Sequence, residues 1–282
     1  MRRRTRLVSR LFLTAALALS AQRAPAADAN PEDGTLVDGV YANAYFALRW
    51  PLPVGWKAGL QPPRPSYSGY YVLNTPTPPA EVRATILVAA QDSFFAAEPQ
   101  HDAAALAKEL ARWAEAADHR TIEPTIVTIA GRSFARIAIA GDPLSRIVLA
   151  TDIRCHVLIF TFTGAEPELL AKLAGSLEGL TLAAPAPPFP ACVKGYATRQ
   201  TILRRVEPVP AGPKFLKIPV RVVIGSDGRT RHIHVIRAFP EQQKNVEDAL
   251  AQWEFKPYRE NGQPAEIETG LVFEFKPRDQ QK

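Results

Sequence analysis

Alternation of apolar and polar residues is clearest near the C-terminus. Apolar residues recur at every second position across residues 218–225, which predicts a half-buried strand. Ser226-Asp227-Gly228 predicts a tight turn, and residues 231–236 a returning strand. From 240 to 253, apolar residues recur at spacings of three and four, which predicts a helix packed on this hairpin. Residues 266–275 alternate again and predict a final strand.

Residues 40–182 show a mixed pattern. Short apolar or β-branched runs predict strands at 44–50, 70–73, 84–90, 125–129, 135–140, 147–151 and 157–162. A helix fits residues 102–117, with Asp102 as N-cap and with Leu106, Leu110, Trp113 and Ala117 on the inward face. A second helix fits residues 167–177. The pattern predicts an α+β fold, in which an antiparallel sheet is covered by helices.

Proline marks the boundary between two predicted domains. Residues 183–191 contain four prolines, so we expect a short, stiff linker between a domain at 40–182 and a second domain at 192–282. Residues 27–39, rich in Ala, Asp, Asn, Pro and Gly, are predicted to form a disordered leader.

The first 26 residues have the composition of a secretory signal. An arginine-rich start precedes an apolar run at 11–21 and the small-residue triplet Ala24-Pro25-Ala26. We therefore predict cleavage between Ala26 and Ala27, with residues 18–20 as a second possible site. The apolar run is about half the roughly 20 residues that a spanning helix needs. An uncleaved anchor in the inner membrane is the alternative, and only then would the protein contact a membrane.

The net charge of the chain falls once this segment is removed. The formal charge of +6 falls to about zero, because residues 1–26 hold six arginines and no acids. A general basic field for nucleic acid is therefore not expected. Residues 27–190 carry a net −5 and residues 191–282 a net +5. The halves could dock on each other, or the basic half could bind an acidic partner.

The order of motifs in the C-terminal part resembles a known family. Three motifs are similar to those of the C-terminal domain of TonB-family energy transducers. They are the strand followed by Asp227-Gly228, the helix that ends in Gln252-Trp253-x-Phe255-Lys256-Pro257, and the Asn261-Gly262 turn before the last strand. The resemblance covers residues from about 200 to 277. It implies a periplasmic protein-binding module linked to envelope transport, and no enzyme.

In that family the last strand pairs edge-on with an extended segment of an outer-membrane receptor, which is binding by β-augmentation. The resemblance therefore implies a partner-binding edge made of Glu266, Ile267, Glu268, Thr269, Gly270, Leu271, Val272, Phe273, Glu274 and Phe275. An ordinary sheet edge, protected by its glutamates, is the alternative. The family's usual Pro-x-Tyr-Pro opening and its long Pro/Lys/Glu rod are missing, so a binding unit is expected more than a force transducer.

The N-terminal part carries a second, weaker resemblance. Tyr45-Phe46-x-Leu48-x-Trp50-Pro51 followed by Pro53-x-Gly55-Trp56 resembles the opening of PsbP-like domains, which implies a fold more than a function. Six aromatic residues of this part could line a ligand cleft or could pack in the core: Tyr45, Trp50, Trp56, Tyr67, Tyr70 and Tyr71. A periplasmic ligand-binding or sensing protein that uses this cleft is therefore the alternative function.

The remaining candidates for chemistry are few. Cys155 and Cys192 could form a disulfide in an oxidising periplasm, or Cys155 could be buried as a free thiol. His232 and His234 share one face of a strand but have no third ligand at a metal-site spacing, so a solvated sheet face is expected. The chain has no P-loop, GxGxxG or EF-hand motif. We predict no cofactor, no metal and no catalytic residue, and a protein as the partner.

Overall fold

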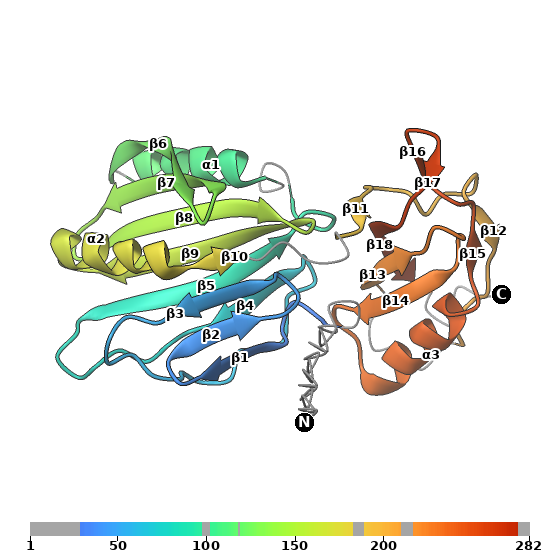
Figure 1. The fold of residues 1–282 in the computed structure, drawn as a ribbon, viewed down its shortest axis with the longest axis horizontal. Coiled ribbons are helices and arrows are strands. Elements are labelled where there is room, and N and C mark those ends of the chain that lie inside the picture. Colours follow the sequence, from blue (N-terminus) through green and yellow to red (C-terminus); the bar gives the residue numbers. More distant parts are fainter. Residues whose placement is uncertain (1–28, 98–101, 118, 183–188, 210–216, 276–282) are drawn as a thin grey trace, which may run out of the picture.

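A computed structural model of the protein describes residues 29–97, 102–117, 119–182, 189–209 and 217–275. Its strands and helices form two units, an N-terminal unit of residues 29–182 and a C-terminal unit of residues 189–275 (Figure 1). Antiparallel sheets combined with three α-helices confirm the predicted α+β class. None of the helices in these ranges has the length and apolar character needed to cross a membrane.

A six-stranded antiparallel sheet is the centre of the N-terminal unit. Its strands, in spatial order, are β4 (Tyr70–Asn74), β5 (Ala84–Asp92), β9 (His156–Gly164), β8 (Ser145–Ile153), β7 (Arg132–Ala140) and β6 (Arg120–Ile129). β5, β8 and β9 are apolar along most of their length because both faces of the sheet are covered there.

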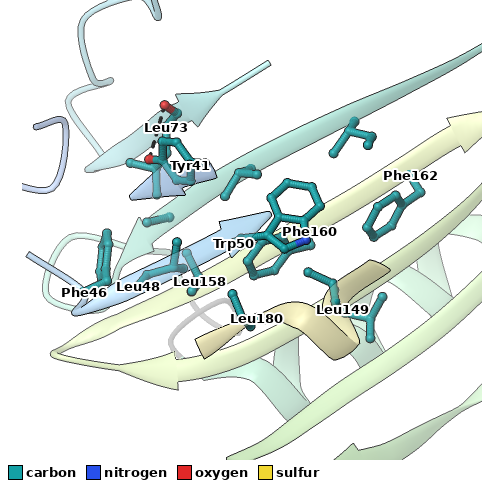
Figure 2. Close-up of a cluster of buried hydrophobic side chains, with 14 of the residues drawn as sticks. Tyr41, Phe46, Leu48, Trp50, Leu73, Leu149, Leu158, Phe160, Phe162 and Leu180 are labelled. Atoms are coloured by element: carbon teal, nitrogen blue, oxygen red, sulfur yellow. Dashed lines mark hydrogen bonds between the residues drawn. The ribbon is translucent and has the colours of Figure 1, made fainter. Parts of the chain in front are cut away.

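One face of this sheet packs on a smaller sheet and a helix. The smaller sheet consists of β1 (Gly34–Val37), β2 (Val40–Asn43), β3 (Leu48–Pro51) and β10 (Thr181–Leu182), and the helix is α2 (Pro167–Gly175), which continues into the 3-10 turn η1 (Ser176–Gly179). Figure 2 shows this core, in which the Trp50 ring meets Phe160 edge-on at 5.6 Å. The Tyr41 hydroxyl donates to the Leu73 carbonyl, so its polar end is satisfied.

Among the described residues, α1 (Ala103–Ala116) is the helix that packs on the opposite face. Asp102 caps it as predicted, because its side chain accepts from the Ala105 N–H at 2.7 Å. The predicted inward face is confirmed at Leu106, which is buried, and at Leu110, which packs against the same core. It was wrong at Trp113 and Ala117, which are exposed, and it missed the buried residues Ala103, Ala107 and Ala114. Small alanines let α1 lie close to the sheet, and Trp113 is left at the margin of the contact.

Two other predictions for the N-terminal unit were wrong. The supposed disordered leader contains β1, which pairs with β2 across an Asp38-Gly39 turn with positive φ at both residues. The single strand expected at 44–50 is instead a turn at residues 44–47 followed by β3. Ala47 has a φ of 49°, which is incompatible with a continuous strand.

The C-terminal unit is a four-stranded sheet with one helix. The strand order is β11 (Ala191–Cys192), β18 (Ile267–Glu274), β13 (Lys217–Ile224) and β14 (Thr230–Val235), and α3 (Pro240–Leu250) packs on one face. Two short pairs complete the unit: β12 (Ile202–Arg204) with β15 (Glu254–Phe255), and β16 (Arg259–Glu260) with β17 (Gln263–Pro264). The hairpin, helix and last strand predicted from the alternation are therefore present.

Glycine is required at the tip of the β13–β14 hairpin. Gly228 has a φ of 79°, and a β-carbon there would overlap the carbonyl oxygen of Phe255. The same Gly228 carbonyl accepts from the Phe255 N–H at 2.8 Å. The Asp227-Gly228 turn thus anchors the segment that follows α3 against the hairpin.

Candidate functional site

The predicted partner-binding edge, β18, has a different neighbour on each side. On one side it pairs antiparallel with β13 along its whole length, from Ile267 to Glu274. On the other it pairs parallel with β11, but only at Ile267 and Glu268. Among the described residues no strand pairs with the rest of this second side, from Gly270 to Glu274. We call this part of β18 the open edge.

Backbone groups at the open edge follow from the β11 contacts. The Ala191 and Val193 N–H groups donate to the carbonyls of Glu266 and Glu268, both at 3.0 Å. Backbone groups alternate between the two sides along a strand, so Gly270, Val272 and Glu274 direct theirs to this same side. Val272 lies opposite Pro219 of β13, which has no N–H to offer it. The Val272 N–H and carbonyl therefore point away from the sheet.

The side chains of β18 alternate between the two faces of the sheet. Ile267 and Phe273 are buried in the core under α3, and Leu271 packs against that core. On the other face Glu268 is buried against the N-terminal unit, whereas Val272 is 46% exposed. The remaining members of the predicted edge include Glu266 and Glu274, which are exposed, and Thr269, which is buried.

Close packing from the N-terminal unit ends at Gly270. A β-carbon at this position would lie 2.6 Å from the β-carbon of Phe94 and 2.9 Å from Cζ of Phe95. Only glycine lets these two rings approach the strand so closely. The phenylalanines thus form one wall beside the beginning of the open edge.

Behind the open edge, four buried charges join the two units. Arg221 of β13 contacts Asp92 Oδ2 at 2.5 Å and Glu268 Oε1 at 2.9 Å, and Arg154 Nε lies 3.6 Å from Glu268 Oε2. Each unit supplies one cation and one anion, so the quartet is neutral. The two units therefore meet through paired charges.

Burial shifts the pKa values of ionisable groups in and around the quartet. Burial raises the pKa of Asp92, although the Arg221 guanidinium opposes this. Burial, with Arg221 nearby, holds the pKa of His156 well below its usual range. His156 is therefore neutral, and its Nε2, 3.9 Å from Asp92 Oδ2, makes no ion pair. Tyr45 donates to Glu268 at 3.1 Å, and burial raises its pKa well above 10.

A disulfide joins the units beside the quartet. Cys155 and Cys192 are bonded, with their Cα atoms 5.6 Å apart, within the normal range. Cys192 belongs to β11, so the disulfide also holds β11 on β18. The predicted cleavage pair Ala26 and Ala27 and most of the predicted linker lie outside the described residues.

The two strand histidines contact Asn30 and Glu32, which precede β1. His234 Nε2 lies 2.9 Å from Glu32 Oε1 and its ring stacks on Tyr71, while His232 Nε2 lies 3.1 Å from Asn30 Oδ1. A solvated sheet face was therefore the wrong prediction for His234, which is buried. Across the described residues, no group of three potential metal ligands occurs.

The six aromatic residues that could line a ligand cleft or pack in the core of the N-terminal unit are divided between these two outcomes. Tyr45, Trp50, Trp56 and Tyr71 are buried members of the core. Tyr67 lies at the surface with Arg237 near its ring. Tyr70 is half-buried and lines a cavity beside α1, so core packing applies to the first four residues and not to Tyr70.

Sequence reasoning missed the quartet. Arg221 is a charged residue in a strand whose neighbours are apolar on both faces, and this was the available signal for a buried ion pair. Its partner Asp92 lies 129 residues away, so no local pattern could identify it.

Comparison with known proteins agrees with the resemblance seen in the motifs. Residues 217–277 match the family model described as Gram-negative bacterial TonB protein C-terminal, so the C-terminal unit contains a TonB-like module. A comparison with curated proteins gave no match. Among solved structures, the solution structure of cyanobacterial PsbP (CyanoP) from Synechocystis sp. PCC 6803 is similar, with 12% identity, a TM-score of 0.37, and coverage of 51% of this chain and 91% of that chain.

Proposed function

We propose that the open edge of β18 binds an extended segment of a protein partner by strand addition, in the periplasm of a Gram-negative bacterium. The TonB-like module supports an envelope setting, and the disulfide suits an oxidising compartment. A segment of an outer-membrane receptor is the proposed partner. The role is binding, without catalysis.

The observation that carries this proposal is the pairing of β11. β11 is a two-residue strand that already lies on this side of β18 in parallel orientation, and the Ala191 and Val193 N–H groups donate to the carbonyls of Glu266 and Glu268. This side of β18 is therefore competent for strand addition. A partner segment would continue the sheet where β11 leaves it, next to Gly270, Val272 and Glu274.

The size of the open edge limits what backbone bonding can contribute. Three residues offer one N–H and one carbonyl each, and a net hydrogen bond stabilises by about 1 kcal/mol. The cost of association, at least about 4 kcal/mol, consumes most of that gain. Side chains of the partner must supply the rest, and the rings of Phe94 and Phe95 beside Gly270 offer an apolar contact for one of them.

Val272→Pro tests the proposal, because it removes the outward N–H while Pro is tolerated at a strand edge. Val272→Ala is the matched control, since it shortens the side chain and keeps the N–H. Binding of the exported chain to synthetic peptides from the periplasm-facing segments of outer-membrane receptors is measured by fluorescence polarisation. We expect Val272→Pro to weaken binding roughly tenfold, as the loss of one backbone hydrogen bond of about 1.4 kcal/mol predicts.

Amide hydrogen exchange gives a second, independent measurement. A bound strand should slow exchange at the Val272 amide and leave the already paired Glu268 amide unchanged. Equal binding by the proline and alanine variants, or binding without protection of Val272, would show that the partner uses another surface.

A further inference from the structure

A cleft beside α1 is separate from the open edge and from the interface of the two units. It consists of two adjoining cavities of about 220 Å³ each, which share Leu110, Trp113, Ile139 and Arg146 as walls. The inner cavity lies between α1 and the six-stranded sheet, where Tyr70 of β4, Gln91 of β5 and residues of β7, β8 and β9 line it. The outer cavity opens past Trp113 toward Leu144. We call the two together the α1 cleft.

The inner cavity is lined mainly by apolar side chains. Leu106 and Leu110 of α1 form one side, and Val148 and Ile159 of the sheet form the other. Its amide, Gln91, is already engaged, because Nε2 donates to the carbonyls of Ser68 and Asp92. The interior therefore offers apolar contact, which suits a hydrocarbon body.

Large apolar side chains lie exposed at the mouth of the α1 cleft. Trp113 is 48% exposed and Leu144 is 51% exposed, although both line the outer cavity. Exposed apolar groups that surround a concave site are typical of a surface that a ligand covers. Trp113 lies here because α1 turns mostly alanines toward the sheet and leaves Trp113 at the side of the contact.

Arg146 supplies the charge at the wall that the two cavities share. No ion pair or hydrogen bond joins its side chain to another residue in the described ranges, and no carboxylate of those ranges lines either cavity. Glu109, the acidic residue of α1 one turn before Trp113, is bound by Arg112. His119 is the other titratable group at the outer cavity. The guanidinium is thus available for an external anion.

We propose that the α1 cleft binds a small amphiphile of the alkyl-carboxylate class. The hydrocarbon body lies between Leu110 and Val148, and the carboxylate meets the guanidinium of Arg146 at the mouth. Apolar burial supplies affinity, and the Arg–carboxylate pair selects an anionic head over a neutral one. This binding does not depend on the strand-addition function.

Decanoate and decanol are the probes, because they share a hydrocarbon chain and differ in the charge of the head. Each is titrated below its aggregation concentration into the chain without residues 1–26, and binding is followed by calorimetry and tryptophan fluorescence. We expect saturable binding of decanoate with a blue shift, and at least tenfold weaker binding of decanol. Trp113→Phe should remove the fluorescence change and keep the heat of binding.

Arg146→Gln should lower decanoate affinity to the level of decanol. Arg136→Gln is the matched control, because Arg136 lies on the neighbouring strand at a position that faces the opposite side of the sheet from Ile137 and Ile139. Absence of saturable decanoate binding, equal affinity for the two probes, or an unchanged affinity in Arg146→Gln would each overturn the proposal.

Discussion

Arg221→Met is the sharpest test of how the two units are joined. The substitution keeps an apolar stem of similar length and removes the cation that contacts Asp92 at 2.5 Å and Glu268 at 2.9 Å. Both carboxylates then remain buried, with Arg154 as the nearest cation to Glu268 at 3.6 Å. Removing one partner of a buried ion pair costs about 3–5 kcal/mol.

We expect a value near the lower end of that range. Burial already raises the pKa of Asp92, so without Arg221 this carboxyl can take up a proton and reduce the cost of its burial. The folded-state pKa is then above the unfolded value, which means that stability is lost as pH rises through it. The deficit of Arg221→Met should therefore be larger at pH 8 than at pH 5.

Urea unfolding with the disulfide intact measures this difference, and Arg231→Met is the control. Arg231 contacts Asp227 at a similar distance, 2.7 Å, but both side chains are about half exposed. Exposed pairs contribute about 0–1 kcal/mol. If Arg221→Met lost no more free energy of unfolding than Arg231→Met, the claim that buried charges hold the units together would be refuted.

Three further predictions concern stability. Gly228→Ala should cost at least about 2 kcal/mol, because its φ is positive and its new β-carbon would overlap the Phe255 carbonyl; a shift in urea midpoint below that of a surface substitution would contradict this. Replacing both Cys155 and Cys192 by Ser should cost about 4 kcal/mol from the 37-residue separation alone, and calorimetry that finds no fall in Tm would contradict the constraint. The lowered pKa of His156 means that stability is present above pH 6.5, the unfolded value, and is lost as pH falls below it; His156→Asn should flatten that loss by up to about 1.4 kcal/mol per pH unit, and equal slopes would disprove the assignment.

The sequence predicted the C-terminal hairpin, helix and last strand because each has a strong local period. Alternation across β13 and the three-four spacing in α3 describe faces that are buried by neighbours close in the chain. Part of the inward face of α1 was missed for a physical reason. Its inward residues are mainly alanines, and a rule that looks for large apolar side chains assigns Trp113 to the core in their place.

Other features of the fold either had a sequence signal that was not used or had no sequence signal. Asp38-Gly39 is the same type of turn signal as Asp227-Gly228 and would have indicated the β1–β2 hairpin. The pairing of Arg221 with Asp92 and of His234 with Glu32 depends on the docking of two units, so only the folded structure shows it. The same holds for β11, whose two residues have no period of their own.

The placement of β11 has a consequence for work on isolated pieces of this protein. A fragment limited to the family match, residues 217–277, would lack β11 and both cysteines, and with them the strand that pairs with Ile267 and Glu268 of β18. In such a fragment the side of β18 away from β13 would be unpaired along its whole length, and the charges of Arg221 and Glu268 would be uncovered. We expect it to dimerise or aggregate edge to edge where the intact chain stays dispersed. Partner screens that use the fragment would therefore report binding to a surface of β18 that is covered by β11 in the whole protein.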